Sequence, residues 1–343
     1  MSMSNTRSSH VVLDDVIDKL WDISINRSTR AVYEAGFRAF HRFSNLYPSG
    51  YLSHTHPIIS EDILIYFVAF CVSSLRLKYS TIKTYLAGTR FAYIKVGFPD
   101  PCCFPNGQPF LRLRTILKAV KKSQQNVVKP RLPITAFILN QLCQQLRSGF
   151  LGAYEDLVLE SAFCLAFFGF LRCGEFTSKS TTFDPMSDLC IQDIQLHSYD
   201  HYFTLNLKVS KTDPFRRGIS LTYFATDQHI CPLTPMLALM QTRLAVSAQP
   251  QDPMFTTLAG TPLTRAFLID KLKILLSRLG YDSALYSGHS FRIGAATTAA
   301  AANIPDHMIR TLGRWTSDCY CRYIKTSHAS LQQAQQAMCG LLE

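Results

Sequence analysis

One short region interrupts an otherwise helical sequence, and it limits the folds that this chain can adopt. Apolar residues recur at helical spacing along most of the chain, but between residues 189 and 221 they alternate with polar ones in three short runs, CIQDIQLHS, YFTLNLKVS and RGISLTYF. Alternation with a period of two is typical of half-buried strands, and turn-like segments separate the runs. The sequence therefore predicts a mainly α-helical protein with a small antiparallel β-sheet in its C-terminal domain.

The helical pattern divides into two parts. At 343 residues the chain is long enough for two domains that each bury a core. A polar, Pro-bearing stretch over residues 123–133 separates the parts and is typical of a linker. In the first part, Ser28 is the expected cap of the second helix and Ser60 of the third. We predict a helical N-terminal domain over residues 11–122 and a second domain over residues 134–343.

Positive charge is concentrated in one segment. The net charge is +11, and between Arg76 and Arg131 twelve Lys or Arg residues accompany a single acidic residue, Asp100. Such a density suits a polyanion, because each cation placed on a phosphate releases condensed counterions. A solvated basic face would give the same count. The residues expected to bind DNA are Arg76, Lys78, Lys83, Arg90, Lys118, Lys121 and Lys122.

Composition and spacing argue against several other classes of protein. No apolar run approaches the roughly 20 residues that cross a bilayer, so no membrane association is expected. The polar N-terminus lacks the apolar core of a signal peptide, so we expect a protein that is not secreted and whose eleven cysteines are thiols. These cysteines lack the paired spacing of a zinc site. No metal and no cofactor are predicted.

The segment over residues 288–324 carries the most chemical information. His289 and Arg292 lie three residues apart at an expected helix start, so both side chains are on one face and can reach one phosphate. An Ala- and Thr-rich continuation lets this helix lie close to its neighbours. A Gly-Arg-Trp triplet that ends at Trp315 follows, and Tyr323 comes after it. The segment indicates a phosphate-binding site.

At these residues the sequence resembles the tyrosine recombinase and integrase family, which includes Cre-like and Xer-like enzymes. The family pattern is an Arg in a helix-ending L-R-x-x-E, a Lys on a β-hairpin, an H-x-x-R box, a His or Trp, and a Tyr. The pattern falls here, in the same order, on Arg172 in LRCGE, Lys211 in VSKTDP, His289 and Arg292 in HSFR, Trp315 in GRW, and Tyr323 in RYI. The resemblance covers nearly the whole chain. The form GRWTSDCYCRYI is most similar to recombinases of eukaryotic mobile elements of the Crypton or DIRS type.

The resemblance implies a metal-independent enzyme that cuts and rejoins DNA through a covalent 3′-phosphotyrosine. Arg172 and Arg292 would clamp the phosphate oxygens, because guanidiniums offer paired donors to developing negative charge. Tyr323 would be the nucleophile, with His289 as its general base or hydrogen-bond partner. Glu175, three residues after Arg172, could instead hold that guanidinium in an ion pair.

Two further side chains complete the implied site. Lys211 would protonate the leaving 5′ oxygen, and Trp315 would donate its indole N–H to the phosphate. Lys208 is an alternative to Lys211, because hairpin boundaries are uncertain by a few residues. Tyr320 is likewise an alternative to Tyr323, which follows Trp315 by eight residues, one fewer than is common among bacterial relatives.

The resemblance also implies how the protein assembles. Family members close a helical domain and a catalytic domain around duplex DNA as a two-domain clamp. An amphipathic tail with Leu331, Met338, Leu341 and Leu342 would dock on a neighbouring subunit, giving a dimer on each DNA site and a homotetramer on two. A DNA-binding protein that has lost cleavage and a type IB topoisomerase are the alternatives. A eukaryotic element protein would act in the nucleus, and any other in the cytoplasm.

Overall fold

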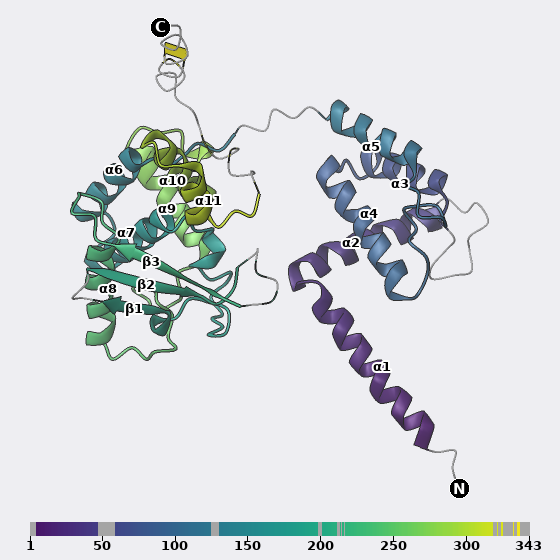
Figure 1. The fold of residues 1–343 in the computed structure, drawn as a ribbon, viewed down its shortest axis with the longest axis horizontal. Coiled ribbons are helices and arrows are strands. Elements are labelled where there is room, and N and C mark those ends of the chain that lie inside the picture. The colour runs from purple at the N-terminus through teal and green to yellow at the C-terminus, as the bar shows by residue number, and fades with distance from the viewer. Residues whose placement is uncertain are drawn as a thin grey trace. The chain divides into compact units, whose positions relative to one another are not determined.

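The chain folds into two compact units, Met1–Val128 and Lys129–Glu343 (Figure 1). The computed structural model describes residues 5–46, 59–124, 130–197, 201–210 and 217–317, and single positions at 213, 215, 321, 324, 332, 335 and 336. The prediction of a mainly helical protein with a small antiparallel sheet in its C-terminal half is confirmed. The expected linker, residues 123–133, spans the division between the units, and most of the expected tail helix lies outside the described residues.

Helices dominate the described part of the first unit. They are α1 (Asn5–Ser24), α2 (Arg27–Leu46), α3 (Glu61–Ser73), α4 (Tyr79–Lys95) and α5 (Leu111–Ser123). Ser60 caps α3 as predicted, because its hydroxyl accepts a hydrogen bond from the Ile63 N–H at 3.3 Å. The predicted cap of α2 is wrong. Asn26 accepts from the Thr29 N–H at 2.8 Å, and Ser28 lies inside the first turn. Asn and Ser cap helices about equally well, so the residue types did not separate the two positions.

Aromatic side chains fill the core of this unit. Phe40 and Phe67 are fully buried, and their ring centroids lie 5.2 Å apart in an edge-to-face arrangement. Tyr93 of α4 adds a third ring, 6.4 Å from Phe40. Helices α2 and α4 approach so closely that a Cβ on Gly88 would lie 2.3 Å from the carbonyl oxygen of Tyr33. A residue without a Cβ is therefore required at this crossing.

The second unit combines helices with the small sheet. Its helices are α6 (Ala136–Arg147), α7 (Ala153–Phe168), α8 (Leu233–Ala245), α9 (Arg265–Arg278), α10 (His289–Ala301) and α11 (Asp306–Gly313). The strands β1 (Ile194–His197), β2 (Tyr202–Leu207) and β3 (Ile219–Phe224) form an antiparallel sheet in the order β1-β2-β3. Lys211 belongs to the connection between β2 and β3, and it lies outside the described residues.

Helix α7 is buried along most of its length and anchors the sheet. Alternate residues of β2, namely Phe203, Leu205 and Leu207, are buried. Tyr223 of β3 stacks on Phe203 with ring centroids 4.7 Å apart, and its hydroxyl donates to the Leu165 carbonyl at 3.3 Å. This contact fixes β3, and with it one end of the β2–β3 hairpin, to the helix whose end carries Arg172.

Gly294 of α10 lies against the segment that leads into α6. A Cβ at this position would lie 1.7 Å from the carbonyl oxygen of Ile134. The Ile134 N–H donates to the Ser290 carbonyl at 3.0 Å, so the segment is held in place and cannot easily move aside. We expect Gly294→Ala to lower the free energy of unfolding by about 3 kcal/mol, at the upper end of overpacking effects. Urea unfolding measures this change.

Gly174 provides a matched control for the same substitution. It is exposed, and a Cβ there would have no neighbour within 4 Å. Gly174→Ala should therefore change the free energy of unfolding by less than about 0.5 kcal/mol. Equal destabilisation by the two substitutions would contradict the close contact at Gly294.

Candidate active site

The end of α7 presents the first predicted site residue. Phe170 follows the helix with a φ of 49°, in the left-handed region, and turns the chain away. Arg172 then precedes a 3-10 turn over Cys173–Glu175. Its Nη1 donates to Oε1 of Glu175 at 2.9 Å, and its backbone N–H donates to Oε2 at 2.9 Å. The Arg172 side chain remains 25% exposed, whereas the side chain of Glu175 is 4% exposed. The interpretation that Glu175 pairs with Arg172 is confirmed as a contact.

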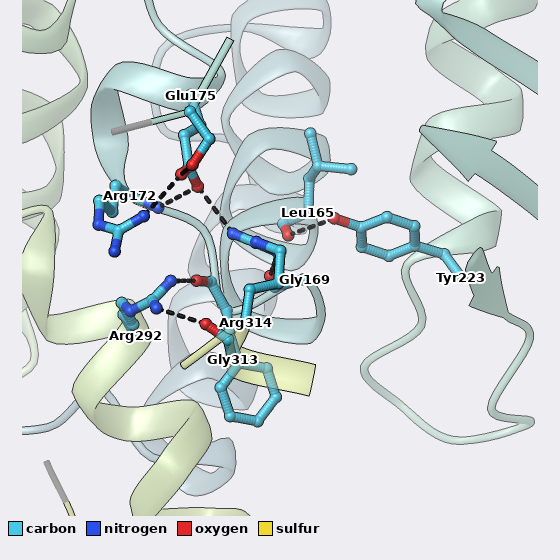
Figure 2. A network of polar contacts seen from close by, with 10 residues as sticks. Leu165, Gly169, Arg172, Glu175, Tyr223, Arg292, Gly313 and Arg314 are labelled. Atoms are coloured by element: carbon cyan, nitrogen blue, oxygen red, sulfur yellow. Dashed lines mark hydrogen bonds and ion pairs between the residues drawn. The ribbon is translucent and has the colours of Figure 1, made fainter. Parts of the chain in front are cut away.

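Glu175 connects three segments of the unit. Its Oε2 accepts from Nη2 of Arg314 at 2.8 Å, next to the bonds from Arg172 (Figure 2). Its Oε1 also accepts from the Ser210 hydroxyl at 3.1 Å. Ser210 directly precedes Lys211 in the chain. One buried carboxylate thus joins the end of α7, the hairpin between β2 and β3, and the end of α11.

Arg292 of α10 ties two helix ends together. Its Nη1 donates to the carbonyl of Phe170, and its Nη2 donates to the carbonyl of Gly313 at 2.5 Å (Figure 2). Both carbonyls lie at helix C-termini, where the helix dipole favours a cation. The Trp315 ring centroid lies 4.5 Å from Cζ of Arg292. Arg292 has no exposed surface, so its guanidinium is held inside the domain.

Arg314 is a third guanidinium at this place, and the family pattern assigned it no role. It caps α11 with φ 54° and ψ 46°, a left-handed conformation that favours glycine. Its Nη1 donates to the Gly169 carbonyl at 2.9 Å, and its Nη2 binds Glu175. Its Nε is buried with no hydrogen-bond partner in the described structure. The only signal in the sequence was its place in the GRW triplet.

His289 begins α10 and lies close to these arginines. The residue is half-buried. Burial, with the positive charges of Arg292, Arg172 and Arg265, lowers the pKa of the imidazole below its ordinary value of 6.5. The ring is therefore mostly neutral at pH 7, as a proton acceptor must be. Arg265, exposed at the start of α9, was not predicted, because no sequence spacing connects it with the H-x-x-R box.

Comparison with known proteins adds the identity of the fold. No family model and no curated protein sequence matches the chain. XerH site-specific recombinase bound to its difH substrate has a TM-score of 0.59 over 90% of this chain and 78% of that chain, at 17% identity. Tn1549 transposon integrase, in complex with circular intermediate DNA, has a TM-score of 0.52 over 88% and 98%, at 12% identity. A lambda integrase dimer bound to a core site has a TM-score of 0.52 over 92% and 77%, at 15% identity.

This chain has the tyrosine recombinase fold. Within it, residues that are far apart in the sequence lie together, and Figure 2 draws Arg172, Glu175, Arg292 and Arg314 in one region of the second unit. The charges of Arg172 and Arg292 also act on His289. Tyr323 and Tyr320 lie outside the described residues, as Lys211 does. The assignment of catalytic roles to the six residues of the motif stays a prediction.

Trp315 belongs to the hydrophobic core of the recombinase fold. It is 8% exposed, and its ring packs edge-on against Phe170 with centroids 5.9 Å apart. Together with the contact to Arg292, this packing braces that guanidinium from one side. Donation of the indole N–H to a phosphate stays a prediction.

Lys208, the alternative to Lys211, is engaged in contacts of its own. Its Nζ lies 2.7 Å from Oδ2 of the buried Asp193 and 3.2 Å from Sγ of Cys190. Burial acts to lower the pKa of Lys208, but the hydrogen bonds to Asp193 and Cys190 and the charges of these two groups together outweigh it, so the pKa is raised. An ammonium held in this way is poorly suited to deliver a proton, which weighs against Lys208 as the general acid.

Two basic regions accompany the arginine cluster, and the first of them adjoins it through Arg314. A cavity of about 650 Å³ between the β2–β3 hairpin and α11 is lined in part by Arg217, His307, Arg310 and Arg314. In the first unit, the seven cationic residues predicted to bind DNA are all exposed, on α4, on α5 and before α4. Arg90 is paired with Asp100 at 2.6 Å, which offsets part of its charge. DNA binding by these residues stays a prediction.

The described residues were also considered for membrane-spanning helices and metal ligands, and they contain neither feature. No helix there is both long and apolar enough to span a membrane. No group of three or more His, Cys, Asp or Glu side chains there could hold a metal ion.

Proposed function

We propose that this protein is a DNA strand transferase that cleaves and rejoins DNA through a covalent 3′-phosphotyrosine on Tyr323. The observation that carries the proposal is the grouping of Arg172, His289 and Arg292 in a recombinase fold. Such a group of cations suits a phosphodiester, whose non-bridging oxygens gain negative charge as phosphorus is attacked. The order of the motif residues in the sequence adds support.

Arg172 is the direct phosphate contact in this proposal. Its side chain is partly exposed, and the N–H groups that do not bind Glu175 can donate to a non-bridging oxygen. Arg292 has no exposed surface, and it supports Arg172 through the nearby Phe170 carbonyl. Direct contact between Arg292 and the phosphate requires the residues that cover it to move. The two arginines therefore contribute differently to the clamp.

The proton transfers fall to His289 and Lys211. As the phenolic oxygen of Tyr323 bonds to phosphorus, its proton passes to the neutral imidazole of His289. The bond from phosphorus to the 5′ oxygen breaks, and Lys211 protonates that oxygen. The contact between Ser210 and Glu175 supports this role, because it holds the residue before Lys211 at the arginine cluster. Rejoining is the reverse reaction, and since one phosphate ester replaces another, no external energy source is needed.

The proposed substrate is duplex DNA, held by the two units as a clamp. The XerH structure is a complex with difH DNA, and the lambda integrase structure is a dimer on a core site. We infer that the exposed cations of the first unit bind the DNA backbone, and that a dimer occupies each site with a homotetramer on two. The form of the GRW segment supports a role in integration and excision of a Crypton- or DIRS-type mobile element, in the nucleus of a eukaryotic host.

A nicked suicide substrate tests the function. The protein is incubated, in a chelator, with nicked duplexes taken from the DNA that flanks its gene, and products are separated on a denaturing gel. A covalent adduct at a defined position supports the proposal. Specific binding without an adduct would indicate a DNA-binding protein that does not cleave. Relaxation of supercoiled plasmid by monomers at scattered sites would indicate a topoisomerase instead.

The pH dependence of cleavage should report His289. The pKa of His289 is lowered, and only the neutral ring accepts a proton. The single-turnover rate should therefore decrease on the acid side of its pH profile, its acid limb, at a pH below 6.5. Arg265→Gln removes a positive charge that lowers this pKa, so the limb should move to higher pH. Arg265→Lys keeps the charge and should leave the limb in place. A limb that does not move in Arg265→Gln would contradict His289 as the titrating group.

A further inference from the structure

Arg314 faces inward where α7, α11 and the hairpin meet, and the proposed reaction gives it no step. Its terminal nitrogens donate to the Gly169 carbonyl and to Oε2 of Glu175. With 9% of its side chain exposed, its charge is directed at Glu175 rather than at solvent. A DNA-backbone ligand requires an exposed guanidinium, so this position does not suit one. Its left-handed backbone would be less strained in glycine, which indicates that the side chain itself contributes to the site.

The two oxygens of Glu175 are divided between different partners. Oε1 accepts from Nη1 of Arg172 and from Ser210, whereas Oε2 accepts from the Arg172 backbone N–H and from Arg314. A carboxylate beside a guanidinium favours a side-on pair with two parallel hydrogen bonds. Arg314, together with the Arg172 backbone N–H, occupies the oxygen that such a pair with the Arg172 side chain would use. In the described contacts, the Arg172 side chain therefore binds Glu175 through Nη1 alone.

We propose that Arg314 is a positioning residue for strand transfer, which restrains Glu175 so that Arg172 presents the rest of its guanidinium to the phosphate; this inference rests on the proposed function. The same restraint reaches the hairpin, because Ser210 binds the other oxygen of Glu175. One inward-facing arginine thereby sets the orientation of the phosphate ligand and the start of the loop that carries Lys211.

Arg314→Gln tests this role by removing the charge and the forked donor. At saturating DNA, the single-turnover rate of adduct formation should fall about 100-fold, the cost of misplacing a reacting group by about 1 Å. DNA affinity and its salt dependence should not change, because no phosphate contact is lost. An unchanged rate would overturn the proposal. So would a clear decrease in the salt dependence, since it would place Arg314 on a DNA phosphate.

A second variant separates positioning from a purely structural role. If Arg314 acts through Glu175, the double variant Arg314→Gln/Glu175→Gln should be no slower than the slower single variant. If the rate reductions of the two single variants multiply in the double variant, the proposal is overturned. If a urea unfolding curve shows that Arg314→Gln is not folded, Arg314→Lys is used in its place. A lysine keeps the positive charge but lacks the planar fork of the guanidinium. Slower cleavage with an unchanged urea midpoint is expected of Arg314→Lys, and wild-type cleavage would count against the proposal.

A crystal structure of Arg314→Gln gives a readout that needs no activity. We expect both oxygens of Glu175 to bind the guanidinium of Arg172 in this variant. If Glu175 in this variant still binds the Arg172 side chain through Nη1 alone, the positioning role of Arg314 is overturned. This holds even if the wild-type protein cleaves DNA. The expected rearrangement in a protein that never forms an adduct would support the restraint by Arg314 and refute the proposed function.

Discussion

Tyr323→Phe is expected to abolish the covalent protein–DNA adduct while DNA affinity stays within about twofold of wild type. The substitution removes only the phenolic oxygen and keeps the ring. Tyr323 itself lies outside the described residues, but Ile324, the next residue, packs against the core of the second unit. A labelled suicide substrate on a denaturing gel measures the adduct, and mass spectrometry of the linked peptide identifies the tyrosine.

Tyr320→Phe is the matched control, because it removes the same atom from the neighbouring candidate. This variant should form the adduct at the wild-type rate. The reverse result, with the adduct lost in Tyr320→Phe and kept in Tyr323→Phe, would move the nucleophile to Tyr320. An adduct in both variants, with no phosphotyrosine in the linked peptide, would refute the phosphotyrosine mechanism itself.

Arg172→Lys is expected to slow single-turnover cleavage by about 10²- to 10³-fold, the usual cost of removing one donor to a developing oxyanion. Arg172 serves two acceptors in the proposal, Glu175 through Nη1 and the phosphate through its remaining N–H groups. A lysine keeps the charge but has no planar fork, so it cannot satisfy both acceptors in fixed geometry. Quenched time courses at saturating DNA measure the rate.

Arg147→Lys is the control for this substitution. Arg147 also pairs with a buried carboxylate in the second unit, donating to Oε1 of Glu160 from Nε at 2.9 Å and from Nη2 at 2.5 Å. This pair includes no residue of the candidate site, so the cleavage rate should stay within about twofold of wild type. Equal slowing by the two substitutions would show that the loss at Arg172 comes from general destabilisation.

The fold was largely predictable from periodicity. Alternation in the runs around Phe203 and Tyr223 predicts strands, because one face of the sheet packs on a buried helix. The residue that caps a helix was harder to predict from the sequence. The cap of α2 is Asn26, although Ser28 has an equally suitable side chain. Both residue types cap helices about equally well, so the residue type alone does not choose between the two positions.

Within the described part of the site, the sequence motif predicted that certain residues lie together. It did not predict the groups to which their side chains bind. Arg172, His289 and Arg292 gather as expected, because the ends of α7 and α11 meet the start of α10. The complete burial of Arg292 and the inward orientation of Arg314 could not be read from the sequence. Both depend on backbone carbonyls that become neighbours only after folding.

Arg292 has a consequence for how the second unit orders. Its guanidinium donates to the carbonyls of Phe170 and Gly313, and it packs under Trp315 in the hydrophobic core. The loop with Arg172 and the segment after α11 can separate only if a buried charge gives up its acceptors. Closing the core and assembling the arginine cluster are therefore one cooperative event, and the cluster should be as rigid as the core itself.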